Sequence, residues 1–390
     1  MTQQYGKIGF LFHLGHGHYT QFLNFQECLP AEYEGRPEWI PLPGDQSGDR
    51  IAGMPFLPSG IRYRRHQIWH ARQGAARHQE WDALFFACMQ IGLLPVLRRH
   101  RSYLYTDLSP SLKRELAPWY NHQLPKNAVQ AWLKNRVETR VYNTLEGLFT
   151  MSEWSAAGIR KDYNVPAERV HVSLPGANLN RWHYVDRSER SSNRPVRVLM
   201  VGGQFRLKGG EYVLEWAERS RLRNWELDIV TWPGELPQWV QEILEYPSAD
   251  LRVTKRLAPR IPNVRVHCGI RANTPEAMQL FADADIFCLP TQADGSSIAS
   301  LEAMATGLPV LVGAVGGIPE LIRDGVTGFL LKPGDRMDLQ CKLERLIADR
   351  EMRLTVGAAA RQSCEDKYNV TRQLHDIFHV LDRDRSAPRR

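Results

Sequence analysis

The alternation of short apolar runs with longer helical patterns is the feature that most limits how this chain can fold. Runs such as KIGFLF at 7–12 and VRVLMVG at 196–202 are rich in Val, Ile and Phe, and a glycine-containing turn and a segment of helical period follow each of them. Strands that alternate with helices in this way are typical of parallel sheets covered by helices. The sequence therefore predicts an α/β fold.

The alternation is interrupted once and then starts again. Residues 186–197, DRSERSSNRPVR, are polar and contain a proline, which is typical of a linker. At 390 residues the chain is also long for a single hydrophobic core. We therefore expect a first doubly wound domain over 1–190 and a second over 191–365. Two such sheets hold ligands in a cleft between the carboxyl ends of their strands.

Composition excludes several classes of protein. No stretch approaches the roughly 18–20 uninterrupted apolar residues of a membrane span, and the start, MTQQYGKIGFLF, lacks the features of a signal peptide. The six cysteines form no C-x-x-C pair, which argues against a zinc site and against a disulfide framework. We expect a cytoplasmic protein without a zinc site or a disulfide framework.

A glycine-rich stretch with two cations is the first candidate binding site. In VGGQFRLKGGEYVLEWA, residues 201–217, an apolar strand ends in two glycines, passes Arg206 and Lys208, and enters a helix at a second glycine pair. Glycines allow close backbone approach, and a helix N-terminus offers unpaired N–H groups to an anion. A diphosphate suits this arrangement, whereas the alternative is a plain turn with exposed cations. A dinucleotide fingerprint fits less well, since G-x-G-x-x-G is absent.

Two carboxylates eight positions apart form the second candidate. In ADGSSIASLEAMATG, residues 293–307, Ser296 or Ser297 is a good N-cap for a helix that ends at Gly307. Eight helical residues span about 12 Å, so Asp294 in the loop and Glu302 in the helix suit the two ends of an elongated polyhydroxylated ligand. Neither a shared metal nor a close acid–base pair suits that spacing. In the alternative, Asp294 only caps the helix and Glu302 is solvated.

The order of motifs over LPTQADGSSIASLEAMATGLPVLVGAVGGIPELIRDGVTGFLLKPGD, residues 289–335, resembles the family 4 glycosyltransferases. VGGQFRLKGG resembles the diphosphate-binding stretch of that family, and residues 149–182 are similar to its inter-domain segment. The resemblance implies a GT-B architecture of two Rossmann-like domains, with residues 366–390 as a C-terminal helix that returns to the first domain and ends in a disordered tail. It also implies a nucleotide-sugar donor in the cleft and retention of the anomeric configuration without a dedicated base. By the same resemblance we expect no metal, and no cofactor besides the donor substrate.

Position by position, the resemblance assigns roles to specific residues. Glu302 would hold the ribose hydroxyls, Asp294 would lie near the transferred sugar, and Arg206 with Lys208 would hold the diphosphate in place of a metal. Further donor contacts are expected from Gly15, Gly17, Ile270, Arg271, Gly295, Ser296 and Ser297. The family usually has Glu where Asp294 stands and Phe-Gly where Ser296 and Ser297 stand, so the identity of the sugar does not carry over.

The first domain contributes one candidate of its own. Asp107 follows the apolar run LYT in LYTDLSP, where related enzymes often carry a His or Asp that faces the reaction centre. We expect it to contact the sugar or the acceptor, with capping of the turn as the alternative. His16 and His18, in the turn GHGHY, are further candidates for the same task.

The distribution of charge bears on partners. Residues 1–190 hold 23 Lys and Arg against 17 Asp and Glu, with cations concentrated at 62–81 and 98–101. Peripheral contact of this basic surface with an anionic membrane is one hypothesis, and a solvated face or a phosphorylated acceptor is the alternative. No nucleic-acid-binding module is found. The predicted function is thus transfer of a hexose from a nucleoside diphosphate sugar, UDP-sugar before GDP- or ADP-sugar, to an unidentified acceptor such as a membrane lipid or another glycoside. The alternatives are a GT-B epimerase or phosphorylase, or a non-catalytic nucleotide-sugar-binding protein.

Overall fold

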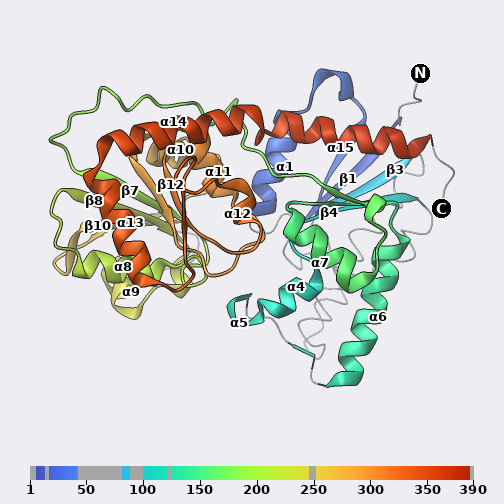
Figure 1. Ribbon diagram of the computed structural model, residues 1–390, viewed down its shortest axis with the longest axis horizontal. Helices are drawn as coiled ribbons and strands as arrows, with labels where there is room; N and C mark the ends of the chain where they lie inside the picture. Colours follow the sequence, from blue (N-terminus) through green and yellow to red (C-terminus); the bar gives the residue numbers. More distant parts are fainter. Residues whose placement is uncertain are drawn as a thin grey trace. The chain divides into compact units, whose positions relative to one another are not determined.

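The computed structural model describes residues 6–13, 17–42, 81–87, 100–120, 124–125, 127–245 and 252–386. The chain divides into two compact units, of which the first comprises 1–175 together with 370–390 and the second comprises 176–369 (Figure 1). Each unit is built on one sheet with helices packed against it.

The first unit has a parallel sheet with the strand order β2-β1-β3-β4-β5-β6 in the part of the chain that the structure describes. Its elements are β1 (Ile8–His13), α1 (Gly17–Glu27), the 3-10 helix η1 (Ala31–Tyr33), β2 (Pro37–Leu42), β3 (Ala83–Ala87), β4 (Arg101–Thr106), α4 (Pro110–Glu115), α5 (Ala117–Tyr120), α6 (Ala128–Thr144), β5 (Gly147–Thr150), α7 (Glu153–Tyr163), η2 (Ala167–Arg169), β6 (Val170–Val172) and α15 (Val370–Arg385). The short apolar run LPVLRR at 94–99, for which the sequence also predicts a strand, lies outside the described residues.

Strand β1 shows how alternation builds two cores in this unit. Phe10 and Phe12 pack in one cluster of buried residues, and Leu11 packs in another, because successive side chains of a strand point to opposite faces. The first cluster also holds Ile377 and Phe378 of α15, so the C-terminal helix covers the sheet of the first unit.

The second unit has the strand order β13-β12-β11-β7-β8-β10-β9, parallel except for the antiparallel edge strand β9. Its elements are β7 (Val196–Val201), α8 (Gly210–Arg219), β8 (Trp225–Thr231), η3 (Pro233–Glu235), α9 (Gln238–Leu244), β9 (Val253–Leu257), β10 (Ile261–Cys268), α10 (Pro275–Asp283), β11 (Ile286–Leu289), α11 (Ile298–Ala305), β12 (Val310–Gly313), α12 (Ile318–Leu321), β13 (Phe329–Leu331), α13 (Arg336–Ala348) and α14 (Arg350–Asp366). Both units are therefore of the doubly wound α/β type that the alternation predicts.

The boundary between the units falls before the polar stretch at 186–197, not within it. Arg187 is buried, and its guanidinium donates hydrogen bonds to the carbonyls of Phe281, Ala284 and Thr306 at the ends of α10 and α11. Because these contacts tie the segment to the second unit, the first change between the units lies at 175 and not at the expected 190. The second change lies at 369, close to the expected limit at 365.

Candidate functional site at the carboxyl ends of β7 and β11

The second unit has its topological switch point between β7 and β11. These strands are parallel neighbours; from β7 the chain continues to β8 on one side, and from β11 it continues to β12 on the other. Open α/β sheets bind ligands in the crevice that this reversal leaves at the carboxyl ends of the strands. The glycine-rich stretch follows β7 and the two-carboxylate stretch follows β11, so the fold brings both predicted motifs to this edge.

The loop after β7 is a compact turn that only glycines allow. A Cβ on Gly202 would lie 2.7 Å from Cγ of Lys208, and one on Gly203 would lie 2.5 Å from Cε2 of Trp232. Gly209, the N-cap of α8, has a φ of +79°, and a Cβ there would lie 2.1 Å from the carbonyl oxygen of Pro290. The backbone is therefore packed against the side chains of Lys208 and Trp232.

Lys208 and Asp294 join the two loops. Nζ of Lys208 lies 2.5 Å from Oδ2 of Asp294, and the two side chains are 21% and 9% exposed. The backbone N–H of Gln292 also donates to the carbonyl of Leu207, at 2.9 Å. A largely buried ion pair needs further hydrogen-bonding partners to offset the loss of solvent, and here it places one cation and one carboxylate side by side at the switch point.

Ser297 starts α11, and Ser296 precedes it. The Oγ of Ser297 accepts a hydrogen bond from the N–H of Ser300, so Ser297 is the N-cap of the helix. The carbonyl of Gly295 accepts from the N–H of Gly317, which ties this loop to the Gly-Gly turn before α12. The Oγ of Ser296 is buried without a hydrogen-bond partner among the residues described, so its hydrogen-bonding capacity is unused there.

Glu302 is a buried carboxyl group within α11. Its side chain is 5% exposed, and Oε1 has no hydrogen-bond partner in the described part of the chain. Burial raises the pKa of this carboxyl to about 8. A buried polar atom without a partner is costly, so Glu302 differs from the solvated carboxylate of the alternative interpretation and suits a ligand that brings hydroxyl donors.

The other predicted donor contacts of the second unit lie at the same edge but are more exposed. Arg206 is 69% exposed, and its Nε lies 3.1 Å from Oε1 of Glu211. Ile270 is half-buried and Arg271 is exposed, both in the loop after β10, two strands from β7. Of the two predicted cations, Lys208 is paired with Asp294 and Arg206 is paired with Glu211.

Two further side chains at this edge, Trp232 and Gln292, are not among the residues that the sequence predicts for the site. Trp232 follows β8 and lies against Gly203, whereas the side-chain amide of Gln292 donates to the carbonyl of Pro290, at 2.7 Å. Gln292 lies in the loop shortly after β11, as Trp232 lies directly after β8. Position just beyond a buried strand was the available signal for both, since the carboxyl ends of parallel strands meet at one edge.

Asp107 of the first unit also lies at the carboxyl end of a strand, one residue beyond β4. Its Oδ1 is buried and has no hydrogen-bond partner among the described residues. Burial opposes ionisation, but Lys113, His18 and the backbone N–H groups of Asp107 and Leu108 outweigh it and lower the pKa of this carboxyl. The structure thus places His18 in the electrostatic environment of Asp107. Gly17 begins α1, while Gly15 and His16 lie outside the described residues.

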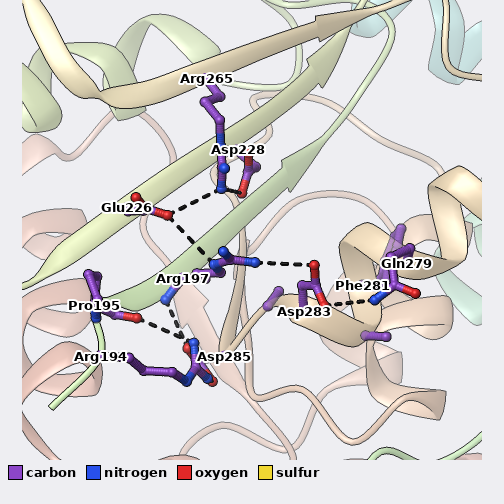
Figure 2. Close-up of polar contacts among 12 residues, drawn as sticks. Arg194, Pro195, Arg197, Glu226, Asp228, Arg265, Gln279, Phe281, Asp283 and Asp285 are labelled. Atoms are coloured by element: carbon purple, nitrogen blue, oxygen red, sulfur yellow. Dashed lines mark hydrogen bonds and ion pairs between the residues drawn. The ribbon is translucent and has the colours of Figure 1, made fainter. Parts of the chain in front are cut away.

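A second charged cluster lies on the second sheet, away from the carboxyl ends of the strands. Figure 2 shows Arg197 between Glu226 and Asp283, and Arg265 between Glu226 and Asp228. Arg197 and Glu226 are each the second residue of their strand, so this cluster lies towards the amino ends of the strands. Its cations and carboxylates are paired with one another, which indicates a structural role.

No group of three or more His, Cys, Asp or Glu among the described residues is arranged to hold a metal ion. The positive groups at the switch point are the side chains of Lys208 and Arg206 and the N-termini of α8 and α11.

The site lies inside a region that matches a known family. Residues 185–363 match the family described as "Glycosyl transferases group 1". The chain is 43% identical over 97 residues to a sulfoquinovosyl transferase, SQD2, of Arabidopsis thaliana, covering 24% of this chain and 19% of that protein. It is 27% identical over 305 residues to an MMP alpha-(1->4)-mannosyltransferase of Mycolicibacterium hassiacum, covering 76% of this chain and 69% of the relative.

Solved structures agree over nearly the whole chain. Sucrose-phosphate synthase from Thermosynechococcus elongatus has a TM-score of 0.71 at 15% identity, with 97% of this chain and 99% of that chain covered. Anabaena Alr3699/HepE in complex with UDP and glucose has a TM-score of 0.68 at 17% identity, with 97% and 99% covered. At such identities the likeness concerns the fold, which is the GT-B fold.

Proposed function

Since residues 185–363 form a domain of the glycosyl transferases group 1 family, we propose that the protein is a retaining, metal-independent hexosyltransferase that uses a nucleoside diphosphate sugar. The observation that carries the proposal is the meeting of the glycine loop and α11 at one switch point, joined by Lys208 and Asp294. UDP-sugar is the favoured donor, because a structural neighbour is described in complex with UDP and glucose.

In the proposed complex the donor lies along the edge from Glu302 to the β7 loop. Glu302 accepts hydrogen bonds from the ribose hydroxyls through the oxygen that has no partner in the described residues. The diphosphate lies near Lys208, with Arg206 at its exposed side and the N-terminus of α8 beyond. Asp294, with the backbone of Gly295 and the Oγ of Ser296, contacts the sugar.

The proposed chemistry is displacement with retention. The bond between C1 of the sugar and the diphosphate oxygen breaks, and the acceptor oxygen forms a bond to C1 on the same face. The proton of the acceptor hydroxyl passes to the departing phosphate oxygen, so no dedicated base is required. Lys208 stabilises the negative charge that develops on the leaving group, and fixed charges of this kind supply much of catalysis.

The acceptor is proposed to contact the first unit near Asp107 and His18. These residues share one electrostatic environment at the carboxyl end of the sheet. A carboxylate held in its charged form orients a hydroxyl group by accepting its hydrogen bond. The acceptor therefore carries at least one free hydroxyl.

Thermal unfolding with UDP, GDP and ADP tests donor binding. A ligand at about a hundred times its dissociation constant stabilises the native state by about 2.7 kcal/mol, and we expect UDP to raise Tm most. Glu302→Ala should remove the shift, whereas Glu242→Ala, at an exposed position of α9, should keep it. If no nucleotide shifts Tm, or if Glu302→Ala keeps the shift of the unchanged protein, the proposal fails.

Turnover separates the enzyme from a binding protein. Hydrolysis of UDP-glucose, or its transfer to a panel of small glycosides, should release UDP at the same rate with and without EDTA. Binding of UDP without release of UDP from any donor would favour the non-catalytic alternative. Analysis of the product anomer by NMR tests retention.

A further inference from the structure

Helix α6 of the first unit carries a concentration of exposed apolar side chains. Twelve large hydrophobic residues of the described chain are exposed, and six of them fall between Trp119 and Val137. On α6 itself the exposed fractions are 65% for Val129, 58% for Trp132, 51% for Leu133 and 45% for Val137. Single exposed hydrophobic residues are ordinary, but a cluster of this kind marks an interaction surface.

The exposed residues share one face of the helix with two cations. At 100° per residue, Val129, Trp132, Leu133 and Val137 fall within an arc of about 140°, and the exposed Arg136 and Arg140 lie inside the same arc. The guanidinium of Arg136 lies over the ring of Trp132, 5.4 Å from its centroid. We name these six residues the α6 face.

The opposite side of α6 anchors the helix to the first unit. Glu138 is fully buried; both of its carboxylate oxygens accept from Nη1 of Arg114, and Oε2 also accepts from the hydroxyl of Tyr163. Tyr142 stacks on Tyr163 with ring centroids 4.6 Å apart. All these contacts lie in the C-terminal half, while residues 128–133 are all exposed, and Figure 1 shows α6 reaching beyond the sheet of its unit.

The charges of the α6 face limit what covers it. Glu138 is the only acidic residue of α6, and it lies on the buried side, so the face is purely cationic. Arg136 and Arg140 have no ion-pair partner within the part of the chain described here. A symmetric dimer through this face would bring the arginines of the two copies together, since an isologous contact repeats the same patch on both sides. A surface that is negatively charged and accepts apolar side chains matches it better.

We propose that the α6 face docks on the surface of an anionic lipid bilayer. Trp, Leu and Val enter the boundary between headgroups and acyl chains, and Arg136 and Arg140 pair with lipid phosphates, as in interfacial helices. In this proposal α6 lies in the plane of the interface, because its other side remains packed on the first unit through Glu138 and Tyr142. Among the described residues no helix is long and apolar enough to cross a bilayer. This surface differs from the cationic stretch at 62–81, of which the structure describes only Trp81.

Sedimentation of the full chain with vesicles tests the proposal. Vesicles of phosphatidylcholine with about 30% phosphatidylglycerol should pellet the protein at low salt, and pure phosphatidylcholine should pellet much less. Trp132→Glu and the double variant Arg136→Gln/Arg140→Gln should each lower the partition coefficient about tenfold. Met337→Glu, at a 64% exposed position of α13, and Arg252→Gln, on a 60% exposed side chain, are the matched controls and should bind as the unchanged protein does.

Thermal unfolding and light scattering complete the test. All four variants should keep the Tm of the unchanged protein and its shift with UDP, so loss of vesicle binding is distinguishable from loss of donor binding. Absence of binding to anionic vesicles would overturn the proposal, as would equal binding by the α6 variants. A dimer that dissociates in the Trp132→Glu variant would show that a second copy covers the α6 face. A lower Tm for Trp132→Glu would show that another part of the chain covers it. Either result would also overturn the proposal.

Discussion

Replacement of Glu302 by Gln is expected to stabilise the ligand-free protein at neutral and alkaline pH. The carboxyl is 5% exposed, and burial raises its pKa from the ordinary value of 4.5 to about 8. A carboxyl whose pKa is higher in the folded state binds a proton more tightly there than in the unfolded chain. Its contribution to stability is fully present below about pH 4.5 and is lost as the pH rises through about 8.

The separation of the two pKa values sets the size of the effect. At about 1.4 kcal/mol per pKa unit, ionisation of Glu302 opposes folding by about 5 kcal/mol once the pH is above 8. The uncharged amide of Gln has nearly the same shape and removes this cost. For a unit of about 200 residues, 1 kcal/mol corresponds to roughly 2–4 °C in Tm. The Tm of Glu302→Gln should therefore exceed that of the unchanged protein by an amount that grows by roughly 3–6 °C per pH unit between pH 5 and pH 8.

Thermal unfolding of both proteins at each pH from 5 to 9, without nucleotide, measures this difference directly. Taking the difference cancels the titration of every group that the two proteins share. Glu242→Gln, at an exposed position of α9, is the control and should give a difference that does not depend on pH. A Tm difference for Glu302→Gln that stays flat across the range would refute the reasoning, because Glu302 would then be ionised at little cost.

Further predictions follow from the contacts at the two carboxyl edges. Lys208→Met should lower the rate of UDP release from UDP-glucose about 10²–10³-fold, because the leaving group loses its fixed cation; an unchanged rate would contradict the assigned role. Gly209→Ala should lower Tm by several degrees, since a left-handed residue with a Cβ costs about 1–2 kcal/mol before its clash with Pro290 is counted. The pKa of Asp107 is lowered, so its charge stabilises the fold above its ordinary pKa of 3.8 and this contribution is lost as the pH falls. Asp107→Asn should therefore lower Tm by more at pH 6 than at pH 3. An equal decrease in Tm at both pH values would contradict the lowered pKa.

Local pattern was sufficient for most elements near the site. The apolar strand before each motif, an N-cap at Ser296 or Ser297, and the end of α11 near Gly307 follow from hydrophobic runs and capping chemistry. The structure confirms these elements and shows that Ser297 is the N-cap. Strand β2 was missed because PEWIPL contains two prolines, which discourage a strand assignment. β2 is an edge strand paired only with β1 in the described sheet, and an edge tolerates proline.

The sequence by itself determined that the chain has two doubly wound units, and that a glycine loop with cations and a pair of spaced carboxylates follow buried strands. These features depend on neighbours along the chain, through hydrophobic period, capping and the φ freedom of glycine. Only the tertiary structure decided that Lys208 pairs with Asp294, 86 positions away, and that the side chain of Glu302 is buried. It also decided that Arg187 belongs to the second unit. Burial and ion pairing depend on which strands become neighbours in the sheet, and the order of the strands cannot be predicted from any short segment of the sequence.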